Sequence, residues 1–145
     1  MNLLELFPPV RTFIFEADHV LTDGYIGLGA EHAATIRRFF ARDLYAIHKA
    51  IQKGYQISVV RIPELPMLPA GITESGIKVI DGRDRIPVVT EATTTLYMNS
   101  IYPAAHAARQ DVLYCCPADA IPEVKALAAY ISPYNGGAGC VYDVI

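Results

Sequence analysis

The sequence predicts an α/β fold built on a parallel β-sheet, and three observations indicate it. An apolar run from Phe13 to Phe15 leads directly into two acids, Glu16 and Asp18, and such a run is typical of a buried parallel strand. A helical pattern over 44–53 and a second apolar run over 56–60 follow. Strand, helix and strand in this order make a right-handed crossover between parallel strands.

Glu16 and Asp18 are the first candidate site residues. They lie at the carboxyl end of the first predicted strand, where ligands bind in open α/β sheets. Because side chains alternate along a strand, we expect the two carboxylates to point to the same side. Desolvated carboxylates held close together need a cation, a metal or a proton. Alternatively, these acids cap a helix or hold the turn that ends at Gly24.

Composition limits the classes of function. The chain has 145 residues, and we expect one domain over 1–145. Hydrophobic residues make up 52% and the formal net charge is −3 without a basic cluster, so neither disorder nor nucleic-acid binding is expected. No apolar run reaches membrane-spanning length, and no secretory signal is evident. Three cysteines, two of them adjacent, do not make a disulfide framework, so we expect a cytoplasmic protein.

The first half of the chain contains a predicted β-hairpin and a predicted helix. After Gly24, the pattern over about 25–40 predicts a hairpin inserted behind the first strand, with glycines at its turn. The one local basic pair, Arg37 and Arg38, is assigned to a solvated face of this hairpin. Asp43 is placed to cap a helix over 44–53, and Gly54 suits the position that ends it. The second strand follows at 56–60.

The second half alternates short strands with short helices. Prolines at 63, 66 and 69 exclude a regular helix in that segment. Strands are predicted over 77–80, 94–98 and 111–116, and helices over 87–93, 103–110 and 122–130. A glycine-rich tail leads from Gly136 to Ile145. Cys115 and Cys116 are expected in the core, whereas the position of Cys140 in the tail leaves its exposure open.

Four segments in order resemble the haloacid dehalogenase (HAD) superfamily, and within it the 3-deoxy-D-manno-octulosonate (KDO) 8-phosphate phosphatases. These segments are 20–24, 40–43, 117–125 and 136–139. The resemblance implies a Rossmann-like sheet with flanking helices and a β-hairpin insertion after the first strand. It also implies Mg²⁺-dependent phosphoryl transfer through an aspartyl-phosphate. The implied assembly is a homotetramer in which hairpins pack together and a neighbour's tail reaches the active site.

The residues at the family's catalytic positions depart from its pattern. The nucleophile position falls on Glu16, one methylene longer than the family's aspartate, while Asp18 keeps the general acid/base position and His19 replaces a glycine. The phosphate-binding Ser/Thr position aligns with Arg61, and the Lys position aligns with Arg85. The family's metal-binding Gly-Asp-Asp motif aligns with Asn99, Ser100 and Ile101, so both of its carboxylates are absent here.

These replacements predict that phosphatase chemistry is lost. A methylene moves the attacking oxygen by roughly 1 to 1.5 Å, and 1 Å of misplacement costs about a hundredfold in rate. Mg²⁺ uses carboxylates as anchors, and at the family's metal positions Ser100 has only a hydroxyl and Ile101 has no ligand atom. We therefore expect no cofactor, with Mg²⁺ bound only if activity remains. Arg61 is expected to pair with Glu16 or Asp18 in place of the metal, or else to point to solvent.

Three functional hypotheses follow. The first is a non-catalytic relative that acts as a binding or assembly subunit, alone as a homotetramer or with an active paralogue, and that binds a small anion through Arg61 and Arg85. The second is a Mg²⁺-dependent phosphatase of a sugar phosphate with Glu16 as nucleophile and Asp18 as general acid/base. The third is a purely structural oligomer with an empty cleft.

Overall fold

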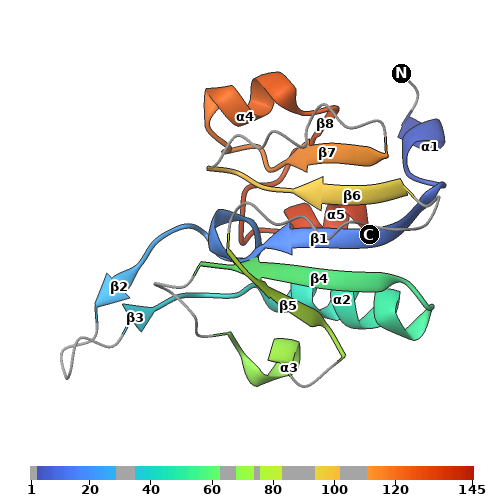
Figure 1. Ribbon diagram of the computed structural model, residues 1–145. Helices are drawn as coiled ribbons and strands as arrows, with labels where there is room; N and C mark the ends of the chain where they lie inside the picture. The colour runs from blue at the N-terminus through green and yellow to red at the C-terminus, as the bar shows by residue number, and fades with distance from the viewer. Residues whose placement is uncertain (1–2, 29–34, 63–67, 74–75, 83–93, 102–110) are drawn as a thin grey trace.

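A computed structural model describes residues 3–28, 35–62, 68–73, 76–82, 94–101 and 111–145 (Figure 1). The predicted helices at 87–93 and 103–110, and Arg85, lie outside these residues. The described chain confirms an α/β, Rossmann-like fold, in which helices flank a six-stranded sheet of order β5-β4-β1-β6-β7-β8. All the pairs in this sheet are parallel.

The strands follow the apolar runs of the sequence. The central strand β1 spans Val10–Glu16 and pairs with β4 and β6, so that Phe15 lies opposite Val59 on one side and Met98 on the other. The remaining strands of this sheet are β4 (Gln56–Arg61), β5 (Lys78–Asp81), β6 (Thr94–Met98), β7 (Val112–Cys116) and β8 (Tyr130–Ile131). Because β1 is central, its carboxyl end lies between the ends of β4 and β6.

Two apolar layers cover the two faces of the sheet. On one face Phe13 and Phe15 pack with α2 (Ala41–Gln52) and with α5 (Cys140–Val144), which contribute Ile47 and Val141. On the other face Ile14 packs with Tyr97 and Tyr114 beneath α4 (Pro122–Leu127). The alternation of side chains along β1 therefore supplies both cores.

The predicted hairpin is present and short. Strands β2 (Gly27–Leu28) and β3 (Thr35–Ile36) pair antiparallel, and Thr22 makes an isolated bridge to Phe39. The hairpin extends beyond the carboxyl ends of the sheet strands, on the side where β1 ends (Figure 1). It is thus joined directly to the segment that follows Glu16.

Several element boundaries differ from the sequence expectations. Helix α2 begins at Ala41 with Phe40 as N-cap, so Asp43 lies inside the helix and does not cap it. The predicted end of this helix is confirmed, because Gly54 has a φ of 90°. The predicted helix over 122–130 ends at Leu127, and Tyr130 belongs to β8. Three further helices were not expected: α1 (Leu3–Leu6), α3 (Ala70–Thr73) and α5.

Candidate functional site

The site is built around the segment that follows β1. Strand β1 ends at Glu16, and the chain turns sharply through Ala17–Leu21 before it enters the hairpin. His19 has a φ of 62°, the left-handed region that side chains rarely adopt, at the position where the resembled family has glycine. Thr22 stabilises the turn, because its hydroxyl accepts hydrogen bonds from the backbone N–H groups of His19 and Gly24.

Glu16 is buried at the end of β1 and is hydrogen-bonded to the neighbouring strand. Its side chain has 5% exposure, and the Tyr97 hydroxyl of β6 donates a hydrogen bond to Oε1 over 2.8 Å. Burial and the Glu16 carboxylate both raise the pKa of Tyr97 well above its usual range, so the hydroxyl stays protonated and remains a donor. The carboxylate at the family's nucleophile position is therefore held by an internal donor.

Asp18 is paired with an arginine of the hairpin. Arg37 Nη1 lies 2.6 Å from Asp18 Oδ1, and the side chains of Arg37 and Asp18 are 4% and 16% exposed. One of the two alternatives for Arg61, a pair with Glu16 or Asp18, is thereby corrected, because Asp18 pairs with Arg37 and Arg61 pairs with Asp81. A cation does neutralise an acid of the site, but it comes from the hairpin.

Arg61 pairs instead with the neighbouring edge strand. Its Nε lies 2.5 Å from Asp81 Oδ1 of β5, which is the register partner of Arg61 in the sheet. Hydrogen bonding to Arg61 lowers the pKa of Asp81, and the same bond raises the pKa of Arg61. Arg61 therefore stands at the carboxyl edge of the sheet with an acid beside it, and its expected role in binding phosphate stays a prediction.

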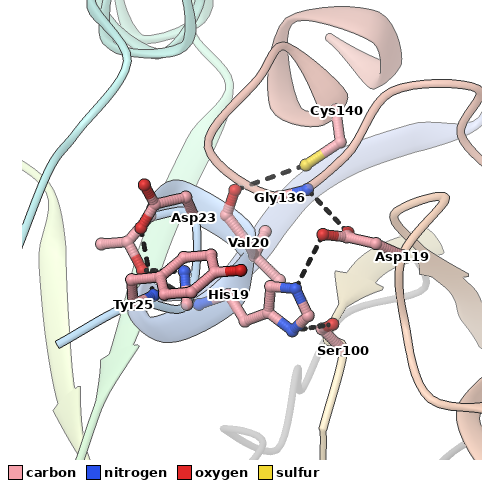
Figure 2. A network of polar contacts seen from close by, with 10 residues as sticks. His19, Val20, Asp23, Tyr25, Ser100, Asp119, Gly136 and Cys140 are labelled. Atoms are coloured by element: carbon pink, nitrogen blue, oxygen red, sulfur yellow. Dashed lines mark hydrogen bonds and ion pairs between the residues drawn. The ribbon is translucent and has the colours of Figure 1, made fainter.

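His19 links the turn after β1 to two other loops of the site (Figure 2). Its Nδ1 lies 2.8 Å from the hydroxyl oxygen of Ser100, and its Nε2 lies 2.8 Å from Asp119 Oδ2. Ser100 is fully buried and occupies a position where the resembled family has a metal-binding aspartate. A neutral imidazole carrying its proton on Nε2 satisfies both partners, because Nε2–H donates to Asp119 and Nδ1 accepts from Ser100.

Asn99 and Ile101 flank Ser100. Asn99 is fully buried, and its side-chain oxygen accepts a hydrogen bond from the Tyr114 hydroxyl. Ile101 is half-buried and has no ligand atom. The polar groups of this loop that the structure describes are thus used to hold neighbouring strands and His19.

The glycine-rich tail packs directly against the turn after β1. A Cβ on Gly136 would lie 2.2 Å from the His19 carbonyl oxygen, and one on Gly137 would lie 2.4 Å from the Asp23 nitrogen. Asp119 Oδ1 accepts a hydrogen bond from the Gly136 N–H over 2.9 Å (Figure 2). Only glycine allows this approach, so the tail glycines belong to the architecture of the site.

The tail then enters α5, which is held by α2. Asp43 Oδ1 accepts a hydrogen bond from the Tyr142 N–H in the first turn of α5 over 3.0 Å. Asp43 thus satisfies a free N–H of α5 rather than one of its own helix. Burial raises the pKa of Asp43.

The cysteines are packing residues among the described residues. Cys115 and Cys116 are buried in β7 as expected, and burial raises the pKa of Cys116 to about 11. Cys140, whose exposure the sequence left open, is fully buried, and its thiol donates a hydrogen bond to the Val20 carbonyl. The approach of the tail to the turn after β1 covers its thiol.

The donor set fits Mg²⁺ poorly. Mg²⁺ requires near-octahedral oxygen ligands, but Asp18 already has a guanidinium beside it and Ser100 is bound to His19. Within the described residues, no three His, Cys, Asp or Glu side chains form a group that could hold a metal ion. Among the described residues, Arg37 neutralises Asp18, and the Tyr97 hydroxyl donates a hydrogen bond to Glu16.

A cavity of about 480 Å³ opens beside this network. It is lined by the tail glycines and by residues of the hairpin and its flanks, among them Asp23, Tyr25 and Arg38. Arg38 forms an ion pair with Asp23, and hydrogen bonding to Arg38 lowers the pKa of Asp23. Charged groups and the exposed side chain of Tyr25 thus line the cavity.

Three residues of the site were not predicted from the sequence: Arg37, Tyr97 and Asp119. Arg37 was assigned to a solvated hairpin face, although its position in the only local basic pair was a signal. Tyr97 and Asp119 lie in segments that were used only for the fold. Their contacts join residues 81 and 100 positions apart, and no local pattern reports such pairs.

Comparisons with known proteins agree with this architecture. No protein-family model matches the chain, and no curated protein matches it by sequence. None of the described helices has the length and apolar character needed to span a bilayer. Solved structures provide the similarity, and three illustrate it.

The first is the KDO 8-phosphate phosphatase from Moraxella catarrhalis in complex with magnesium, phosphate and KDO. Its sequence is 20% identical to this chain, and the TM-score is 0.77. The alignment covers 99% of this chain and 89% of the Moraxella protein. The cobalt-bound deoxy-D-mannose-octulosonate 8-phosphate phosphatase from Haemophilus influenzae is 23% identical, with a TM-score of 0.77 and coverages of 96% and 86%.

The third is a protein from Legionella pneumophila described as a HAD-superfamily hydrolase. It is 20% identical to this chain, with a TM-score of 0.77, and the alignment covers 98% of this chain and 83% of the Legionella protein. At these identities the likeness concerns the backbone, which extends over nearly the whole chain. The protein therefore has the fold shared by KDO 8-phosphate phosphatases and other hydrolases of the HAD superfamily.

Proposed function

We propose that this chain is a HAD-fold protein that does not hydrolyse phosphomonoesters and that acts as a binding or assembly subunit. The single observation that carries the proposal is that both acids after β1 already have internal partners. Arg37 lies on Asp18, and the Tyr97 hydroxyl lies on Glu16. A phosphatase of this fold needs the first carboxylate free to attack and the second free to transfer a proton.

The lengthened nucleophile strengthens this argument. Glu16 already fills its pocket with 5% exposure, and its Oε1 is held by Tyr97. An attacking oxygen must reach an in-line position on phosphorus, and a buried, hydrogen-bonded carboxylate loses nucleophilicity. With no third carboxylate at Ser100 or Ile101, the charge of a transferring phosphoryl group lacks its metal clamp.

The assembly role is supported by the hairpin. Tyr25, Ile26 and Ile36 are 80%, 52% and 55% exposed. These apolar side chains lie on or next to the hairpin that extends past the sheet (Figure 1). An exposed apolar group of this kind is covered when copies of a chain, or related chains, pack together. The proposed partners are therefore other copies in a tetramer or an active paralogue, and the proposed compartment is the cytoplasm.

The alternative function is a Mg²⁺-dependent phosphatase of a sugar phosphate with Glu16 as nucleophile and Asp18 as general acid/base. One observation favours it, because Asp18 Oδ2 is buried and has no hydrogen-bond partner among the described residues. An oxygen in that state can accept a proton or a cation. Glu16, Asp18 and Arg37 would then all have to rearrange for turnover.

A metal titration with an activity assay separates these functions. Calorimetric titration of the full chain with MgCl₂ should give no binding heat, and p-nitrophenyl phosphate should not be hydrolysed with or without Mg²⁺. Mg²⁺ binding and turnover that both vanish in Asp18→Asn would establish the phosphatase instead. Titration with inorganic phosphate then separates a binding subunit from a structural oligomer, and Arg61→Ala tests whether Arg61 contributes.

A further inference from the structure

Arg37 is placed as a buried counter-ion of Asp18. Its side chain is 4% exposed, its Nη1 lies 2.6 Å from Asp18 Oδ1, and its Cζ lies 5.7 Å from the centre of the Phe39 ring. Arginine suits such a site because its guanidinium is permanently charged, weakly hydrated and able to stack on an aromatic ring. Arg37 directly follows β3, so this charge is carried by the hairpin.

Asp18 depends on this cation more than an exposed acid would. Its Oδ2 is buried and has no hydrogen-bond partner among the described residues, so only Oδ1 is satisfied there. A desolvated carboxylate without a compensating charge is strongly destabilising, and removal of one member of a buried pair leaves that charge behind. The charge of Arg37 therefore compensates the buried carboxylate of Asp18.

The neighbouring Arg38 offers a natural comparison. It forms an ion pair with Asp23 of the same loop, but its side chain is 83% exposed. An exposed ion pair contributes little because water screens it. Two consecutive arginines of one hairpin thus contact two acids of one loop, one pair buried and the other at the surface.

We propose that Arg37 is an internal counter-cation that closes Asp18 to divalent metal ions and fastens the β2–β3 hairpin to the turn after β1. The proposal goes beyond the proposed function, because it concerns the charge and the hairpin attachment of the folded protein rather than turnover. It explains how a chain of this fold keeps an acid at this position without a metal carboxylate at Ser100 or Ile101.

The first test compares two charge-removing variants in the full chain. Arg37→Gln should lower the melting temperature by roughly 10 °C, whereas the matched control Arg38→Gln should change it by about 2 °C or less. Hydrogen exchange at Gly27, Leu28 and Ile36 should become faster in Arg37→Gln only. Equal melting temperatures for the two variants would overturn the proposal.

A double variant covers the case in which Arg37→Gln does not fold. Asp18→Asn/Arg37→Gln removes both charges, so it should fold and melt well above Arg37→Gln alone. If the double variant is no more stable than the single one, the loss does not come from an uncompensated Asp18 charge and the proposal fails.

The second test uses Mg²⁺ and Mn²⁺ as probes of the exposed charge. In Arg37→Gln, MgCl₂ or MnCl₂ should raise the melting temperature, and the rise should saturate as the metal concentration increases. At a concentration about tenfold above the dissociation constant of the metal ion, the rise should be a few °C. NaCl of matched ionic strength, the wild type and the double variant should show no such rise. A rise in the wild type that Asp18→Asn abolishes, or no rise in Arg37→Gln, would overturn the closure of Asp18.

The failures of the two proposals can be told apart. The stability of the Arg37 variants decides only the counter-cation, and it can fail while the chain remains non-catalytic. Mg²⁺ binding by the wild type that Asp18→Asn abolishes would overturn the closure of Asp18, and turnover together with it would overturn the non-catalytic proposal as well.

Discussion

At the scale of single residues, the acids that follow β1 are held by partners from distant segments of the chain. Glu16 at the end of β1 receives the Tyr97 hydroxyl of β6. Burial and Glu16 keep the pKa of Tyr97 well above its usual range, so this donor is protonated at neutral pH. The bond therefore links two adjacent strands at the sheet edge that forms the site.

Tyr97→Phe should lower the free energy of unfolding by about 1–3 kcal/mol, because it removes a donor from a buried carboxylate. Urea denaturation at pH 7 measures the loss. Tyr130→Phe is the matched control, since its hydroxyl donates to the partly buried Asp143 and its loss should cost about 1 kcal/mol or less. Similar losses for both variants would mean that Glu16 does not depend on Tyr97.

At the scale of elements, the site is held together by contacts between the tail, α2 and the turn after β1. Asp43 of α2 accepts a hydrogen bond from the first turn of α5, and the tail glycines lie against the backbone of the turn. Helix α5 has only five residues, too few to be stable alone. It forms because α2 and the sheet hold it in place.

The raised pKa of Asp43 predicts a pH dependence of stability. Burial raises the pKa of the folded carboxyl above its unfolded value of 3.8, so the folded state binds more protons between these two values. The contribution of Asp43 to stability is therefore present below the unfolded pKa and decreases as pH rises through the folded pKa. Asp43→Asn does not titrate and can still accept the Tyr142 N–H.

The stability difference between wild type and Asp43→Asn should consequently shift in favour of the variant from pH 3.5 to pH 7. Urea denaturation at several pH values in this range measures the shift. A difference that is constant with pH, or that shifts in favour of the wild type, would show that the folded pKa of Asp43 is not raised.

Gly137→Ala and Gly54→Ala form a matched pair for the tail. Both glycines have positive φ, 67° and 90°, so alanine should cost about 1–2 kcal/mol at either position. At Gly54 no atom lies within 4 Å of an added Cβ, whereas at Gly137 the Asp23 nitrogen lies 2.4 Å from it. Gly137→Ala should therefore cost roughly 1–3 kcal/mol more in the free energy of unfolding. Equal costs would mean that the tail does not pack on the turn.

At the scale of the whole molecule, the candidate site lies at the carboxyl ends of the strands of the six-stranded sheet. The hairpin extends from the same side of the sheet (Figure 1). The hairpin contributes Arg37 to the site and exposed apolar side chains to the surface. Assembly through the hairpin would therefore act on the segment that carries the counter-ion of Asp18.

The double substitution Ile26→Asp/Ile36→Asp should reduce the mass of the assembly measured by multi-angle light scattering. Charges placed on an interface oppose association, and both side chains are more than half exposed, so the fold should be retained. Tyr45→Asp on α2, where the side chain is 57% exposed, is the control and should leave the mass unchanged. An unchanged mass for the hairpin variant would place the interface elsewhere.

The sequence by itself determined the α/β class, the first strand with Glu16 at its end, the hairpin and the strands over 56–60 and 94–98. These features depend on local periodicity and turn chemistry, which a short window of residues carries. Only the tertiary structure decided which side chain or backbone group pairs with each acid of the site. Arg37 rather than Arg61 contacts Asp18, and Asp43 binds α5 rather than its own helix. Such pairs join segments that are distant in the chain, so packing selects the partner from several local candidates of similar chemistry.

The same reason explains why β8 and α5 were missed, because short elements are stabilised by the sheet and helix beside them rather than by their own residues.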